Sequence, residues 1–188
     1  MTTKTILGIM VMLMSSVAGG AQSKWQEKVK DELPLVGHRN WIVIVDSAYP
    51  LQSSFGVETV DTGADQLAVV DYVLDAIKHS RHVRPLVHLD AELKYVPESE
   101  APGVNQYRNE LQSRLSGIPV DSILHQTLID RLNETGKSFH VLVLKTNMTI
   151  PYTSVFVQLD CRYWSAESEA RLRKAMNMSN QHGVKAPQ

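Results

Sequence analysis

Apolar and polar residues along this chain follow two spacings, one typical of helices and one typical of strands. Residues 41–45, Trp-Ile-Val-Ile-Val, form an unbroken run of β-branched and aromatic side chains, which predicts a strand buried on both faces. Residues 65–78 carry apolar side chains every three or four positions, which predicts an amphipathic helix. The same two patterns predict further helices at 25–33, 105–115, 128–133 and 165–176, and further strands at 85–89, 122–124, 139–144 and 155–159.

The order of these elements predicts the fold class. Strands that alternate with helices favour an α/β layered domain, although strand order and direction cannot be taken from one sequence. A chain of 188 residues with 43% apolar residues is long enough for one well-packed domain, which we place at residues 22–164. Residues 165–188 are expected to form a C-terminal helix followed from residue 177 by a loose polar tail.

The N-terminus has the pattern of a secretory signal peptide at residues 1–21. Lys4 precedes an apolar run at 6–17 that is too short to span a bilayer, and small residues follow at 18–21. Cleavage after Ala21 predicts a secreted or periplasmic protein with no membrane segment left after processing. An uncleaved membrane anchor and a buried N-terminal helix are the alternatives for this segment.

Composition excludes several kinds of partner and site. The net charge of −1, with acids and bases interspersed, argues against a nucleic-acid partner. The single cysteine, Cys161, excludes an intrachain disulfide and a multi-cysteine zinc site, and is expected to be a small apolar residue just after a strand. His79 and His82 have no third ligand within sequence reach, so a solvated helix end accounts for them and no metal site is predicted. Phosphate-binding glycine loops and a Gly-x-Ser-x-Gly elbow are also missing.

A histidine and an aspartate lie at the two ends of the 41–45 strand. His38 is in the turn before it, Asp46 follows it, and Pro50 stops its continuation. A buried strand with accessible polar ends is a good support for acid–base chemistry. Turn roles are the alternatives, because histidine can bond to a turn backbone and aspartate commonly accepts turn amides.

This opening pattern resembles that of the sugar mutarotase family that contains D-ribose pyranase and L-fucose mutarotase. The segment 57–77 is similar to the short strand, turn and apolar helix of the fucose branch, and residues 106–111, Gln-Tyr-Arg-Asn-Glu-Leu, are similar to a helix of that branch. His125 stands where the family places a sugar-contacting side chain. Tyr152, Thr153 and Ser154 resemble the Tyr-Gly-Asn or Tyr-Ala-Asn that opens the family's last strand, with a bulkier Thr153 and with serine in place of asparagine.

The resemblance covers roughly residues 33–159 and carries specific expectations. It implies a three-layer α/β/α sandwich with a central mixed or parallel sheet, and a homo-oligomer built as a ring of subunits. It also implies an isomerase that interconverts anomers or ring forms of a free monosaccharide without a cofactor. His38 would be the catalytic residue, and Asp46, His125, Tyr152 and Ser154 would bind the sugar.

The chemistry of these side chains suits that activity. Mutarotation removes a proton from the anomeric hydroxyl and delivers one to the ring oxygen, and histidine can do both near neutral pH. A carboxylate and hydroxyl groups can hold the sugar in register. A secreted module of the same fold that binds a monosaccharide without turnover is the main alternative, and a scaffold without a sugar site is a third. His125 and Tyr152 could also be packing residues with satisfied polar tips.

Overall fold

The computed structural model describes residues 23–181, so the predicted signal peptide at 1–21 lies outside the described residues. Six strands form one sheet: β1 Trp41–Val45, β2 Val57–Asp61, β3 Val83–Asp90, β4 Val120–Ile123, β5 Val141–Lys145 and β6 Val155–Cys161. The helices are α1 Lys24–Glu32, α2 Gln66–His79, the 3₁₀ helix η1 Ala91–Tyr95, α3 Val104–Arg114, α4 His125–Thr135 and α5 Ala166–Gln181.

The sheet is mixed, with the strand order β2-β5-β1-β6-β3-β4. Strand β6 runs antiparallel to both of its neighbours, β1 and β3, whereas the β1–β5, β2–β5 and β3–β4 pairs are parallel. The carboxyl ends of the other five strands therefore meet at one edge of the sheet, together with the start of β6. Loops at this edge come from distant parts of the sequence.

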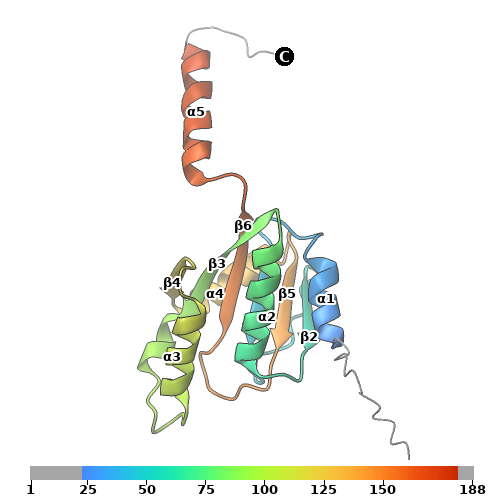
Figure 1. Ribbon diagram of the computed structural model, residues 1–188, viewed down its shortest axis with the longest axis vertical. Coiled ribbons are helices and arrows are strands. Elements are labelled where there is room, and N and C mark those ends of the chain that lie inside the picture. The colour runs from blue at the N-terminus through green and yellow to red at the C-terminus, as the bar shows by residue number, and fades with distance from the viewer. Residues whose placement is uncertain (1–22, 182–188) are drawn as a thin grey trace, which may run out of the picture.

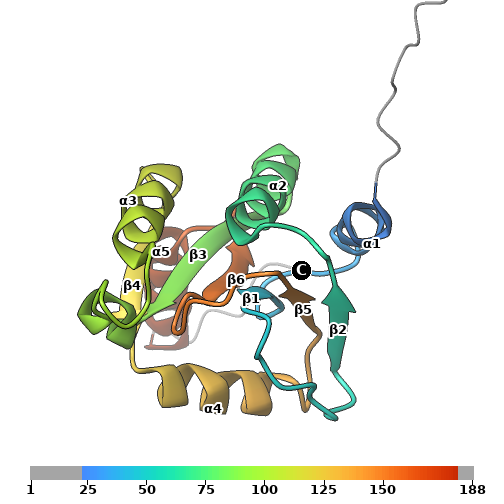
Figure 2. The same cartoon turned by 90° about the horizontal axis from the view of Figure 1, so that it is seen from below.

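Helices cover both faces of the sheet, as predicted for a three-layer α/β/α sandwich. Helices α1, α2 and α3 lie on one face and α4 lies on the other (Figures 1 and 2). The larger core, which includes Ile42, Ile44 and Val70, lies on the first face, and a smaller core around Val43, Leu128 and Phe156 lies under α4. Alternate residues of β1 thus enter the two cores, which explains why the whole strand is apolar.

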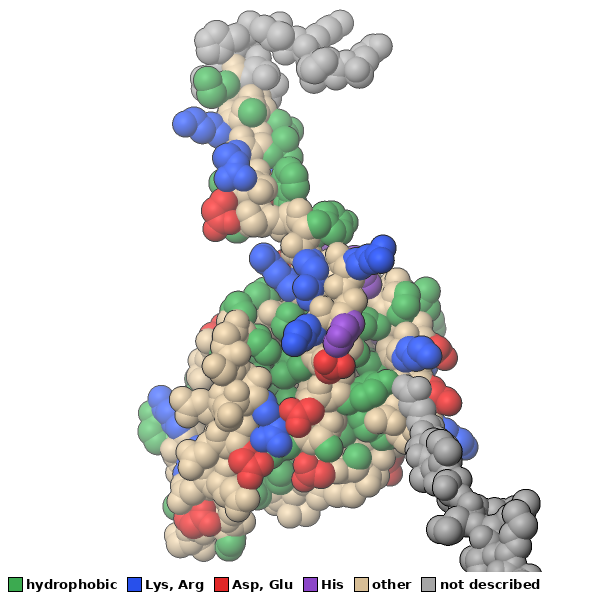
Figure 3. Space-filling model, viewed as in Figure 1, with side chains coloured by type: hydrophobic (Ala, Val, Ile, Leu, Met, Phe, Trp, Pro, Cys, Tyr) green, Lys and Arg blue, Asp and Glu red, His purple; other side chains and the backbone are tan. Residues whose placement is uncertain are grey.

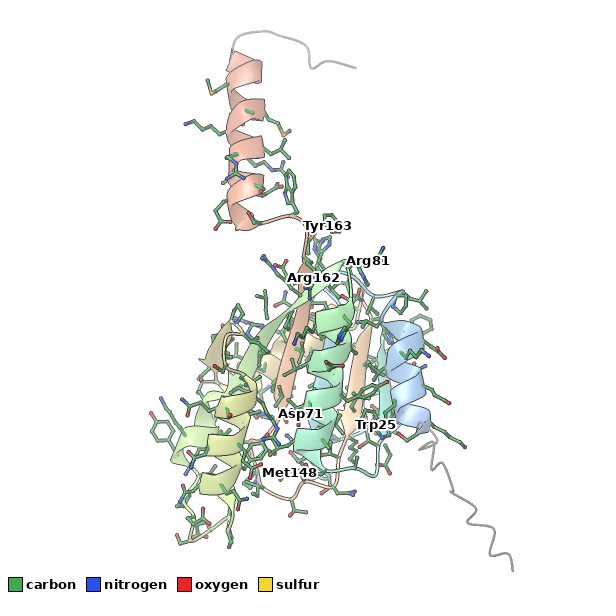
Figure 4. The ribbon with its side chains drawn as sticks, viewed as in Figure 1. Trp25, Asp71, Arg81, Met148, Arg162 and Tyr163 are labelled. Atoms are coloured by element: carbon green, nitrogen blue, oxygen red, sulfur yellow. The ribbon has the colours of Figure 1, made fainter. Side chains whose placement is uncertain are left out.

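Local sequence signals account for the ends of several elements. The Asp65 carboxylate accepts hydrogen bonds from the backbone amides of Leu67 and Ala68, at 2.9 and 3.2 Å, and so caps the start of α2. At the other end of α2, Arg162 donates to the carbonyls of Ile77 and Val83, at 3.0 and 2.8 Å. Figure 4 shows Arg162 at the junction between the sheet and the C-terminal segment, where it fixes the end of β6.

Helix α5 stands apart from the sandwich, beyond the end of β6 (Figure 1). Apolar side chains gather along one side of it, and Leu172, Met176 and Met178 are exposed (Figure 3). The loose tail predicted from residue 177 is wrong in part, because α5 continues to Gln181; the residues beyond it lie outside the described part of the chain. In residues 23–181, no helix combines the length and the apolar character needed to cross a membrane.

The predicted elements are all present, but several boundaries differ. Helix α4 begins at His125, three residues before the prediction, and β3 extends the predicted strand at both ends. Cys161 is the last residue of β6 and not the residue after it. The helix η1 was not predicted, because five residues are too few to show a helical period in the sequence.

Candidate active site at the carboxyl edge of the sheet

Three of the five residues predicted to form the site line one pocket at the carboxyl edge of the sheet. Asp46 follows β1, His125 opens α4, and Tyr152 precedes β6. The pocket has a volume of about 430 Å³, which is in the range that holds a small ligand. These three side chains are up to 106 positions apart in the sequence, and the sheet topology brings them together.

Asp46 is half-buried at the wall of this pocket. Its Oδ1 accepts a hydrogen bond from the backbone amide of Ala48 at 2.8 Å, so the turn role considered from the sequence is present. That contact occupies only one carboxylate oxygen. The other oxygen has lone pairs available for a ligand hydroxyl.

His125 is held by contacts on its backbone and on its ring. Its backbone amide donates to both carboxylate oxygens of Glu92, at 3.1 and 3.0 Å, and its Nδ1 lies 2.9 Å from Asp90 Oδ1. The ring packs edge-to-face against Tyr152, with centroids 5.7 Å apart. The hydrogen bond to Asp90 raises the pKa of His125 above its usual value, against an opposing effect of burial.

Asp90 is a candidate functional residue that the sequence analysis missed. It ends β3, its side chain is fully buried, and burial raises the pKa of its carboxyl although the bond to His125 acts in the opposite direction. Among the described residues, its Oδ2 has no hydrogen-bond partner. The signal was available, because Asp90 directly follows the predicted strand 85–89 just as Asp46 follows 41–45.

A buried polar network holds the turn that contains Tyr152 and precedes β6, here called the Tyr152 turn. The carbonyl of Thr153 accepts hydrogen bonds from the Tyr107 hydroxyl, at 2.7 Å, and from the Gln66 side-chain amide. Gln66 also donates to the Tyr107 hydroxyl at 2.9 Å and accepts from Thr146 Oγ1 at 3.2 Å. Tyr152 itself is 40% exposed and has a left-handed backbone, with φ of 59°. A non-glycine residue in this conformation persists only where its surroundings hold it, and such residues are common at functional sites.

Ser154 does not line the pocket. It is 1% exposed, and its Oγ has no hydrogen-bond partner among the described residues. Thr153 is also buried, with its Oγ1 donating to the Ile150 carbonyl at 2.8 Å, so the bulkier side chain is accommodated within the turn.

His38 lies at the opposite end of β1 from Asp46. It is exposed in a turn in which the Gly37 amide donates to Asn40 Oδ1 at 2.8 Å and Arg39 has a φ of 78°. The five residues of β1 separate the two ends by roughly 17 Å at about 3.4 Å per residue. Within one chain, His38 therefore cannot reach the pocket that contains Asp46, His125 and Tyr152.

Tyr49 is a further buried group in the pocket wall. Burial raises its pKa to about 12, with contributions from the charges of Asp90 and Asp46, and its hydroxyl accepts from Gln52 Nε2 at 2.9 Å.

A larger cavity of about 490 Å³ lies by β3, η1 and α3, but its lining is mainly apolar and contains no histidine. The smaller pocket is therefore the better candidate for acid–base chemistry.

One cluster outside the pocket has the composition of a metal site. Ligand atoms of Glu32, Glu58 and His140 lie within 4.8 Å of one another. The ammonium of Lys28 lies 2.7 Å from Glu32 and 2.6 Å from Glu58, so an ion-pair network already satisfies both carboxylates.

His82, which the sequence pairs with His79, contacts backbone carbonyls. Its Nε2 lies 3.1 and 3.0 Å from the carbonyl oxygens of Leu33 and Val36.

Comparison with solved structures shows which known proteins share this fold. Bacillus subtilis RbsD in complex with D-ribose matches with a TM-score of 0.52 and 16% identity, over 75% of this chain and 95% of that chain. The chain has the RbsD fold. Two structures with lower TM-scores are the fucose mutarotase from Streptococcus pneumoniae in complex with L-fucose (0.48, 19% identity, 73% and 92% covered) and FucU from Bifidobacterium longum (0.47, 17%, 73% and 93%). The chain matches no family model and no curated protein.

The RbsD fold agrees with the resemblance inferred from the motifs at 38–50 and 151–154. The α/β/α layering predicted from that resemblance is confirmed, and of the two sheet types left open, mixed or parallel, the sheet is mixed. At 16% identity the similarity concerns the fold, so activity and substrate must be argued from the side chains of this chain.

Proposed function

We propose that this protein is a mutarotase-like isomerase that interconverts anomers or ring forms of a free monosaccharide by acid–base catalysis. The observation that carries the proposal is the meeting of Asp46, His125 and Tyr152 in one pocket. The RbsD fold supports a monosaccharide ligand, because RbsD is seen in complex with D-ribose.

The pocket residues can divide the reaction between them. Asp46 offers a carboxylate oxygen to the sugar hydroxyls, and Tyr152 offers a hydroxyl that both donates and accepts. An imidazole can take the proton of the anomeric hydroxyl and deliver a proton to the ring oxygen as the bond between the anomeric carbon and that oxygen breaks; the reverse steps close the ring on the other face of the carbonyl. Such acid–base catalysis contributes about 10²–10⁴-fold, and no metal or redox cofactor takes part in this scheme.

His38 can take part in the proposed reaction only if copies of the protein assemble into an oligomer. Since it cannot reach the pocket of its own chain, the catalytic role expected from the resemblance requires the pocket of a neighbouring copy. The turn at 37–40 supports such a role, because it presents an exposed His38 next to a strained Arg39 backbone. We therefore propose a homo-oligomer, with the ring assembly expected from the resemblance.

Exchange NMR on free sugars tests the proposal directly. The protein should accelerate anomer exchange of at least one of ribose, fucose, galactose and glucose above the buffer rate, and Tyr152→Phe should lower that rate. Mixing His38→Ala with Tyr152→Phe subunits should restore activity if the site is shared between copies. A folded, correctly assembled sample that accelerates none of the four sugars would contradict the isomerase assignment.

A monosaccharide-binding module without catalysis is the second candidate. It is favoured by Ser154, which is buried and offers no atom to the pocket at the position where the family carries asparagine. This candidate predicts saturation-transfer signals from a bound sugar without any acceleration of exchange, in wild type and in Ser154→Asn alike.

Export from the cytoplasm is part of the proposal. It rests on the signal-peptide pattern of residues 1–21. Expression of the full chain followed by N-terminal sequencing should show a mature protein that begins near Gln22, and an intact Met1 on the exported protein would contradict it.

A further inference from the structure

The carboxylate of Asp90 lies behind the pocket, in contact with the ring of His125. Its side chain has no exposed surface, its Oδ1 lies 2.9 Å from His125 Nδ1, and its Oδ2 has no hydrogen-bond partner among residues 23–181. A buried carboxylate with one orphaned oxygen is costly for folding. Its position beside His125, the only histidine among the described residues that line the pocket, points to a functional role.

We propose that Asp90 is a positioning residue that holds His125 in the tautomer whose Nε2 exchanges a proton with the sugar. This inference rests on the proposed function and deepens it, because it assigns proton transfer within the chain to His125, for which the sequence suggested only sugar contact.

The tautomer follows from the donor and acceptor properties of the pair. An ionised carboxylate only accepts, so the contact requires the proton of His125 to be on Nδ1. The lone pair is then on Nε2, and no described residue bonds to that nitrogen. Glu92 fixes the backbone of His125, and Tyr152 packs against its ring. Together with the Asp90 contact, these interactions fix the orientation of the imidazole.

The charges that face His125 determine the direction of its titration. Asp90 from β3, Glu92 from η1 and Asp46 after β1 are all acids and favour the protonated ring. Burial and the N-terminus of α4, where His125 is the first residue, oppose protonation. The hydrogen bond to Asp90 is the strongest of these influences. Removal of the charge on Asp90 should therefore lower the pKa of His125 and move the acid limb of the plot of activity against pH to lower pH.

Ser154 contributes to the same arrangement. It carries a second buried oxygen without a partner, and the β3–β6 register ends with Leu89 opposite Val155, so Asp90 and Ser154 are the next residues along the two antiparallel segments. Rotation of the Ser154 hydroxyl, or one water between the two residues, would let Ser154 donate to Asp90 Oδ2. Ser154 would then act on the site through Asp90 and not by touching the sugar.

Nitrogen-15 NMR of the histidine side chains tests the inference without any sugar. Wild-type His125 should show a protonated Nδ1 and a bare Nε2 above its pKa, and the opposite tautomer would overturn the proposal. Asp90→Asn should lower the pKa of His125, because the hydrogen bond to the Asp90 carboxylate is the main influence that raises it. It should also mix the two tautomers, because an amide can donate as well as accept.

The matched control is Asp121→Asn. Asp121, on the neighbouring strand β4, contacts His88 Nδ1, so its replacement removes the same charge beside a different histidine. It should leave the tautomer and pKa of His125 unchanged. An equal change in His125 from both variants would overturn the inference, because the effect would then be one of net charge.

The activity measurements separate this inference from the proposed function. Asp90→Asn should lower kcat by about 10²-fold, while the sugar Kd stays within about twofold and the melting temperature does not fall. An active wild type with unchanged kcat and unchanged pH profile in Asp90→Asn refutes the inference and leaves the proposed function standing. An inactive wild type refutes the proposed function and with it the catalytic part of the inference; the NMR then tests only the tautomer.

Discussion

Replacing Tyr107 with phenylalanine tests whether the polar network behind the pocket holds the Tyr152 turn. The Tyr107 hydroxyl donates to the Thr153 carbonyl at 2.7 Å and accepts from Gln66 Nε2 at 2.9 Å. Tyr107 is 4% exposed, and burial raises the pKa of its hydroxyl, so the group is a neutral donor at any ordinary pH. The variant removes one oxygen atom from a site that water cannot easily refill.

The magnitude follows from the bonds that remain. Each buried hydrogen bond contributes about 0.5–1.5 kcal/mol net, so two lost bonds would cost about 1–3 kcal/mol. The Thr153 carbonyl keeps its bond from Gln66, which places the expected loss at about 1–2 kcal/mol. For a chain of this size that corresponds to a decrease in melting temperature of roughly 2–8 °C.

Thermal unfolding followed by circular dichroism measures this loss, and a sugar titration measures its effect on the pocket. We expect weaker sugar binding as well, because Thr153 directly follows Tyr152 in the turn. Tyr95→Phe is the matched control, since the Tyr95 side chain is 74% exposed and no described hydrogen bond uses its hydroxyl. A melting temperature in Tyr107→Phe equal to that of wild type or of the control would refute the reasoning.

Three further substitutions test other parts of the site. His38→Ala should keep the melting temperature and much of the sugar affinity but lose anomer exchange, because His38 is exposed and the role proposed for it is in the transition state; surviving exchange would remove it from the mechanism. Asp46→Asn should weaken sugar binding by roughly 1.5–3 kcal/mol with little change in stability, since the amide oxygen can still accept from the Ala48 backbone; a lower melting temperature with unchanged affinity would indicate a turn role alone. Arg39→Gly should raise the free energy of unfolding by about 0.5 kcal/mol in urea denaturation, because glycine adopts its φ of 78° without strain, whereas Arg39→Lys should give no gain.

Much of the architecture could be predicted because it depends on local patterns. The apolar run 41–45 is fully buried as β1, and the spacing of 65–78 became helix α2 with Asp65 as its cap. These elements follow from side-chain sterics and from the burial of one face, which act over a few residues. The short 3₁₀ helix and the length of α5 were not predicted, since five residues show no period and the polar sequence after 176 resembles a tail.

The site was predictable in its composition but not in its geometry. The sequence by itself determined which side chains follow buried strands, and therefore that Asp46 would be at an accessible strand end. Only the tertiary structure decided that His125 meets Asp90, that Ser154 is buried behind the pocket, and that His38 lies at the far end of β1. The physical reason is that these relations depend on strand order and register, above all on the position of the antiparallel β6 between β1 and β3. Long-range packing selects that order and register, and no local sequence pattern encodes them.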